Sequence, residues 1–148
     1  MRVARFALII WSFAVPLAAR ETVGTFATWA AFCDEPNKCF AISEPAERTR
    51  HPFLSVAVAG PTLRVHAHLG RAARAARLTI GDAEFALAVS GEDAAADQAT
   101  SRRIVAAMRN GESATLVGTT ARGGRFRHHY LLTGAPSAID AAAVASLR

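Results

Sequence analysis

The sequence lacks the motifs of thiol oxidoreductases and α/β-hydrolases and the long apolar run of a membrane-spanning helix. It has only two cysteines, and their spacing is not the C-x-x-C of thiol oxidoreductases. The G-x-S-x-G motif, which forms the nucleophile turn of many hydrolases, is absent. Its one long apolar run is shorter than the roughly 20 residues that cross a bilayer. These absences argue against a redox enzyme, an α/β-hydrolase and a spanning helix.

The N-terminal segment has the three regions of an export signal. Residues 1–5 carry two arginines and no acid, residues 6–18 are uncharged and mostly apolar, and small residues stand at the exit. We therefore expect residues 1–19 to be a cleaved signal peptide and residues 20–148 to be one domain with no stable membrane span. An uncleaved N-terminal anchor is the alternative, because bulky Leu17 stands where a small residue is preferred before cleavage.

Basic residues outnumber acidic ones only slightly after the signal. Residues 20–148 contain fifteen basic and twelve acidic side chains, a net charge of +3 that is spread along the chain. A nucleic-acid partner is not expected, since binding it requires a clustered basic stripe. We interpret the two densest groups of basic residues as lying in loops or on edge strands, where charge discourages aggregation between strands. These groups are Arg71, Arg74 and Arg77, and Arg122, Arg125 and Arg127.

The two cysteines predict a structural disulfide. Cys33 and Cys39 are separated by five polar or turn-forming residues and follow an export signal, where an even cysteine count indicates pairing. Apolar strand-like runs flank the turn, so the sulfurs would meet across the mouth of a hairpin. The bond would fix the register of that hairpin.

Apolar residues recur in short runs with the two-residue period of β-strands. Turn signals separate most of the runs, and Gly81-Asp82 predicts a tight hairpin. Strands are expected at Phe26–Cys33, Cys39–Ser43, Phe53–Ala59, Leu63–Leu69, Arg77–Ile80, Glu84–Val89, Ser113–Thr120 and Phe126–Thr133. Helices are expected at Ser101–Asn110, capped by Asp97 or Thr100 and stopped by Gly111, and at Ser137–Leu147. The fold class is mainly β, a small sandwich or partly closed barrel of about eight strands with one inserted and one C-terminal helix.

The order of these features resembles the invasion-associated locus B family of exported proteobacterial proteins. The matching segments run from Trp29 and Cys33 through Cys39-Phe40-Ala41-Ile42-Ser43, Leu78-Thr79-Ile80-Gly81, Phe85-Ala86-Leu87, residues 104–111, residues 117–123 and Tyr130-Leu131-Leu132-Thr133-Gly134. The resemblance implies a periplasmic, outer-membrane-associated or secreted β domain, which in some pathogens is linked to host-cell entry. It implies no catalytic residues and no cofactor. The expected function is binding of an unknown envelope or host-facing partner, without catalysis.

Histidines offer the alternative, a periplasmic metal-binding or hydrolytic protein. His66 and His68 share one face of a predicted strand, and His128 and His129 lie on another. If those strands were neighbours, three imidazoles could converge on Zn²⁺ or Cu²⁺. Solvent-facing histidines are the simpler interpretation, because adjacent strand residues point to opposite faces. The acidic pairs Asp34/Glu35 and Glu92/Asp93 are expected to be solvated in turns.

Three aromatic residues near the cysteines allow two interpretations. Trp29 shares a strand face with Cys33, so it is expected to pack over the disulfide. An exposed aromatic cluster of Trp29, Phe32 and Phe40 would instead contact a protein or lipid partner.

Overall fold

The computed structural model describes residues 20–46 and 49–148, so the predicted signal peptide lies outside the described residues. Ten antiparallel strands form one sheet in the order β1-β2-β3-β4-β5-β8-β7-β6-β9-β10. The strands are β1 (Glu21–Phe26), β2 (Trp29–Glu35), β3 (Lys38–Ser43), β4 (Phe53–Ala59), β5 (Thr62–His68), β6 (Ala75–Ile80), β7 (Ala83–Ser90), β8 (Asp93–Ala95), β9 (Ser113–Thr119) and β10 (Arg125–Leu131). The helices are α1 (Gln98–Asn110) and α2 (Ala135–Ala145).

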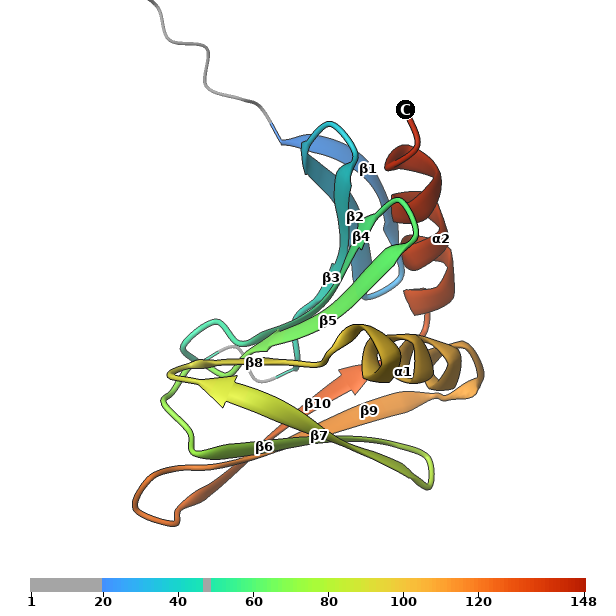
Figure 1. The fold of residues 1–148 in the computed structure, drawn as a ribbon. Helices are drawn as coiled ribbons and strands as arrows, with labels where there is room; N and C mark the ends of the chain where they lie inside the picture. The colour runs from blue at the N-terminus through green and yellow to red at the C-terminus, as the bar shows by residue number, and fades with distance from the viewer. Residues whose placement is uncertain (1–19, 47–48) are drawn as a thin grey trace, which may run out of the picture.

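The sheet bends so that its two halves enclose one core. The first half is β1–β5, the second half is β7, β6, β9 and β10, and β8 lies between them. Helix α2 runs along β1–β4, while α1 packs on β5 and also contacts β6 and β7 of the second half (Figure 1). The sheet stays open, with β1 and β10 as its edges. The predicted mainly-β, sandwich-like class is confirmed, whereas the sheet does not close into the barrel predicted as the alternative, and there are ten strands rather than about eight.

Side-chain alternation divides the sheet into an inner face, which packs on the helices, and an outer face without helices. Inner residues are fully or nearly fully buried, as the two-residue period predicts. They include Trp29 and Ala31 of β2, Leu54 and Val56 of β4, Val65 and Ala67 of β5, Leu78 of β6, Leu116 of β9 and Tyr130 of β10. Burial on this face raises the pKa of the Tyr130 phenol above its usual range.

Two short strands escaped the sequence prediction. The predicted run Phe26–Cys33 is broken, because the chain turns at Ala27, whose φ is 52°, and pairs Phe26 with Trp29 across a hairpin. Strand β8, only three residues long, pairs with both β5 and β7. Neither strand has an apolar alternation long enough to detect. The predicted Gly81-Asp82 hairpin is confirmed, since it joins β6 to β7 with Gly81 at a φ of 57°.

Each helix is held by specific polar contacts. Of the two predicted caps for α1, the structure selects Asp97, whose carboxylate accepts a hydrogen bond from the Thr100 amide at 2.7 Å. Helix α1 ends at Gly111, as predicted. Across the helix pair, Arg109 Nη2 donates to Asp140 Oδ1 at 2.6 Å, which joins α1 to α2.

Candidate functional site

The predicted disulfide is present at the mouth of the β2–β3 hairpin. Cys33 and Cys39 stand directly opposite each other in the strand register and are bonded at an S–S distance of 2.02 Å. Cys39 is fully buried, and Cys33 packs at the margin of the same core. The bond therefore locks β2 to β3 beneath α2, which contacts both strands.

Replacing both cysteines by serine should destabilise the domain modestly. The cysteines are six positions apart, and a loop this short gives about 2 kcal/mol in the chain-entropy model. Urea denaturation of Cys33→Ser/Cys39→Ser should therefore show this loss. The wild-type protein measured in a strong thiol reductant serves as the control and should match the variant. Equal stability of the oxidised wild type and the variant would contradict a stabilising bond.

Trp29 and the two phenylalanines near it lie on opposite faces of the sheet. Trp29 is fully buried, and its indole Nε1 donates to the Leu131 carbonyl at 2.8 Å. The interpretation of Trp29 as an exposed partner-binding residue is therefore wrong. Phe32 and Phe40 instead stack on the outer face with their ring centroids 5.3 Å apart. Both rings are half-buried and uncovered by a helix.

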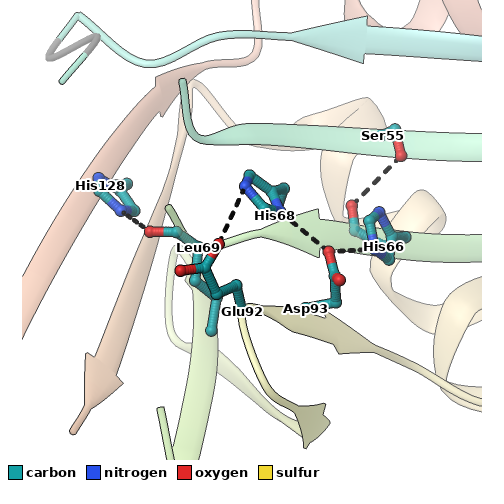
Figure 2. A network of polar contacts seen from close by, with 7 residues as sticks. All are labelled: Ser55, His66, His68, Leu69, Glu92, Asp93 and His128. Carbon is teal, nitrogen blue, oxygen red and sulfur yellow. Dashed lines mark hydrogen bonds and ion pairs between the residues drawn. The ribbon is translucent and has the colours of Figure 1, made fainter. Parts of the chain in front are cut away.

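Two histidines and an aspartate form a polar cluster on the outer face of β5 (Figure 2). Asp93 Oδ1 lies 3.1 Å from His66 Nε2 and 3.0 Å from His68 Nδ1. The register places Asp93 of β8 directly opposite His68 and diagonally from His66. Phe53 of β4 covers the pair, its ring centroid 5.4 Å from that of His68 and 5.7 Å from that of His66.

One carboxylate oxygen thus accepts a hydrogen bond from each imidazole. The bond from His68 and the nearby His66 ring lower the pKa of Asp93 below its usual value. Glu92 adds a second carboxylate, with its Oε2 3.9 Å from His68 Nε2. Both acids are solvent-exposed and Glu92 lies in a turn, as expected, but Asp93 begins β8 rather than lying in the turn and contacts the histidines.

Asp93→Asn should lower the free energy of unfolding slightly. It should also make that free energy less sensitive to acidification. The expected loss near neutral pH is below about 1 kcal/mol, because the Asp93 side chain is 53% exposed. A lowered pKa means that the stabilisation is present above the unfolded-state value of about 3.9 and is lost as pH falls below it. Thermal melting at pH 5 and at about pH 2 should show the gap between wild type and variant closing. Asp82→Asn, in the exposed β6–β7 turn, is the matched control, and a gap that stays constant with pH would contradict the pairing.

The four histidines of the metal hypothesis do not meet. His66 and His68 face outward from β5, whereas His128 of β10 is buried on the inner face with its Nε2 3.1 Å from the Leu69 carbonyl (Figure 2). His129 points to the outer surface of the other half, 3.4 Å from the Thr115 hydroxyl. The imidazoles could converge on a metal only if the two strands that carry them were neighbours, and β5 and β10 are not.

The described residues also contain no group of three His, Cys, Asp or Glu side chains arranged to hold a metal ion. In residues 20–46 and 49–148, no ring of His66, His68 or His128 is hydrogen-bonded to a serine or threonine hydroxyl. His66, His68 and Asp93 form a hydrogen-bonded network at the surface. Strand β8 positions Asp93 for these contacts, and its only signal in the sequence was the acidic pair Glu92-Asp93, whose second residue begins this three-residue strand.

No helix in the described part of the chain is both long and apolar enough to cross a membrane. The sequence matches neither a protein-family model nor a curated protein. The structure, however, is similar to the crystal structure of invasion associated protein B from Bartonella henselae. The two chains superpose with a TM-score of 0.62 at 17% sequence identity, covering 86% of this chain and 99% of the other. The chain therefore has the fold of invasion associated protein B, as the order of its sequence motifs predicted.

Proposed function

We propose that the protein is exported to the bacterial envelope and acts there as a non-catalytic binding protein of the invasion associated protein B type. The observation that carries the proposal is the fold shared with the Bartonella henselae protein over nearly the whole of that protein's chain. The Cys33–Cys39 disulfide supports export, because such bonds persist mainly outside the cytoplasm. The periplasm is the proposed compartment, with association with the outer membrane or secretion as the alternatives.

A binding role is supported by the surface of the first half of the sheet. Phe32, Phe40 and Phe53 stand half-buried on the outer face, which carries no helix. Arg20 and Lys38 lie over the Phe32 and Phe40 rings at 5.7 and 5.8 Å. Aromatic rings with cationic neighbours are typical of surfaces that contact other molecules. Within the described residues, neither His66 nor His68 is hydrogen-bonded to a serine or threonine hydroxyl, which supports a role without nucleophilic catalysis.

Fractionation of a Gram-negative host that produces the full chain tests export. The expected product lies in the periplasmic fraction, begins near residue 20 and has no titratable thiol. A Leu8→Arg/Ile10→Arg variant, which interrupts the apolar run of the signal, should stay in the cytoplasm. A wild-type chain that remains full-length in the cytoplasm with free thiols would refute the proposal.

Pull-down from periplasm and outer membrane, with the exported protein as bait, tests the binding role. Phe32→Ser/Phe40→Ser should lose the captured partner. Val144→Ser removes an apolar side chain that is 58% exposed on α2, away from this face, and should retain it. Capture that is equal for all three proteins would argue against binding through the outer face.

A further inference from the structure

A groove of about 660 Å³ crosses the outer face of the second half of the sheet, over β6, β7, β9 and β10. Four arginines line it: Arg74 and Arg77 from one stretch of sequence, and Arg125 and Arg127 from another. The sequence places the two pairs about fifty residues apart, where they resemble ordinary loop and edge charges. Strand order joins them, because β9 lies between β6 and the edge strand β10.

The strand register aligns these arginines across the sheet. Val117 of β9 pairs with Arg77 on one side and with Arg127 on the other. Residues opposite one another in neighbouring strands point to the same face, so the two guanidinium groups flank the Val117 side chain. Two strand spacings separate the two backbones by about 10 Å. Arg125 is two residues before Arg127 and therefore shares its face.

Positive charge in this groove is largely uncompensated. Its one acid, Glu84, accepts a hydrogen bond from Arg77 at 3.2 Å, but both side chains are more than half exposed. Within the described residues, Arg74, Arg125 and Arg127 have no carboxylate close enough for an ion pair. Four arginines and one glutamate give the groove a charge of +3, which equals the net charge of residues 20–148. The charges of the other residues of 20–148 sum to zero, and the local excess of positive charge in the groove attracts anions.

The groove's side chains indicate the class of ligand. Guanidinium groups bind phosphate and sulfate through paired hydrogen bonds. The hydroxyls of Thr79, Thr115 and Thr119 lie among the arginines and can bond to sugar hydroxyls. No phenylalanine, tyrosine or tryptophan lines the groove, which leaves nothing for nucleic-acid bases to stack on.

From the arginine register, the net charge and the hydroxyls, we infer that the groove binds a saccharide carrying two or more phosphate or sulfate groups. A soluble polysaccharide and the sugar headgroup of a glycolipid present the same chemistry. The inference rests on the proposed export, because such anionic saccharides are met at cell surfaces.

Binding of dextran sulfate to protein purified from cells producing the full chain tests this inference. At about 50 mM NaCl, where screening is weak, Arg125→Gln/Arg127→Gln should weaken binding at least about tenfold. The slope of the logarithm of affinity against the logarithm of salt concentration should become shallower by about two units, one for each lost contact. Arg64→Gln/Arg102→Gln removes the same charge from exposed sites outside the groove and should change affinity less than about twofold. Glu84→Gln should tighten binding about two- to threefold by releasing Arg77.

Three further probes fix the class and the source of the ligand. Neutral dextran should not bind. Phosphatidylcholine vesicles containing a phosphorylated glycolipid should bind through the same two arginines, and the tighter of the two anionic probes identifies the source. A single-stranded oligonucleotide of matched charge should bind more weakly than dextran sulfate.

Three results would overturn the inference: no binding to either anionic saccharide, equal losses in the two double variants, or tighter binding to the oligonucleotide. Circular dichroism and melting of each variant show whether the fold is intact. The assay uses purified protein, so it is independent of the fractionation experiment. If the protein is exported but does not bind anionic saccharides, only the inference about the groove is refuted. If it binds them but stays in the cytoplasm, only the proposed function is refuted.

Discussion

Replacing Gly134 with alanine is expected to destabilise the domain by about 3 kcal/mol or more. Gly134 begins α2 with a φ of 89°, a conformation that side chains with a Cβ rarely adopt. A Cβ built there would lie 2.0 Å from the Phe26 carbonyl oxygen in the β1–β2 turn. Backbone cannot move aside as a flexible side chain does, so α2 or the first hairpin must shift.

Gly123→Ala is the matched control for this prediction. Gly123, in the β9–β10 turn, has a nearly identical φ of 87°, but no atom lies within 4 Å of the Cβ position. Its replacement should cost about 1–2 kcal/mol, the conformational penalty alone. Urea denaturation of both variants measures the difference, which isolates the contact with Phe26. Equal losses would show that the turn yields and that the close approach has no energetic role.

Trp29→Ala is the second large prediction, with an expected loss of about 3–5 kcal/mol. The side chain is fully buried on the inner face of β2, so truncation leaves a large cavity. It also removes the hydrogen bond from the indole to the Leu131 carbonyl at the end of β10. Because residue 29 lies in β2, next to the edge strand β1, and residue 131 ends the opposite edge strand β10, the loss should appear in the cooperative unfolding of the whole domain.

Two variants separate the parts of this effect. Trp29→Phe keeps most of the volume and loses the hydrogen bond, so it should cost about 1–2 kcal/mol. Phe40→Ala removes a half-buried ring from the outer face and should cost less than Trp29→Ala. Chemical denaturation of the three proteins ranks them. If Trp29→Ala were as mild as Phe40→Ala, Trp29 would not be a core residue in solution.

The two contacts form one junction. Gly134 touches the turn that follows β1, and Trp29 is bonded to the residue that ends β10. The Thr28 hydroxyl adds a third contact, donating to the same Leu131 carbonyl at 3.3 Å. This junction ties the first hairpin and α2 to the end of β10, and so connects the part of the sheet with the aromatic outer face to the part with the arginine groove.

Local chemistry was enough for the sequence to specify the fold class, the disulfide and most strands. Alternating apolar residues at Leu54, Val56 and Val58, for example, can bury one face only as a strand. Cys33 and Cys39 are close because a hairpin turn makes them so. The Asp97 cap and the Gly81 turn depend on neighbours within a few residues. In each case the deciding interaction is short-range, so the sequence alone carries it.

Strand order was decided by the tertiary structure, and both surface sites depend on it. Asp93 reaches His66 and His68 only because β8, too short to detect, inserts between β5 and β7. Arg77 and Arg127 line one groove only because β9 pairs with both of their strands. Such pairings depend on how a whole sheet buries its inner face around two helices. No local pattern of charge or hydropathy encodes that choice, which is why a charge spread evenly along the chain becomes a basic groove on one face.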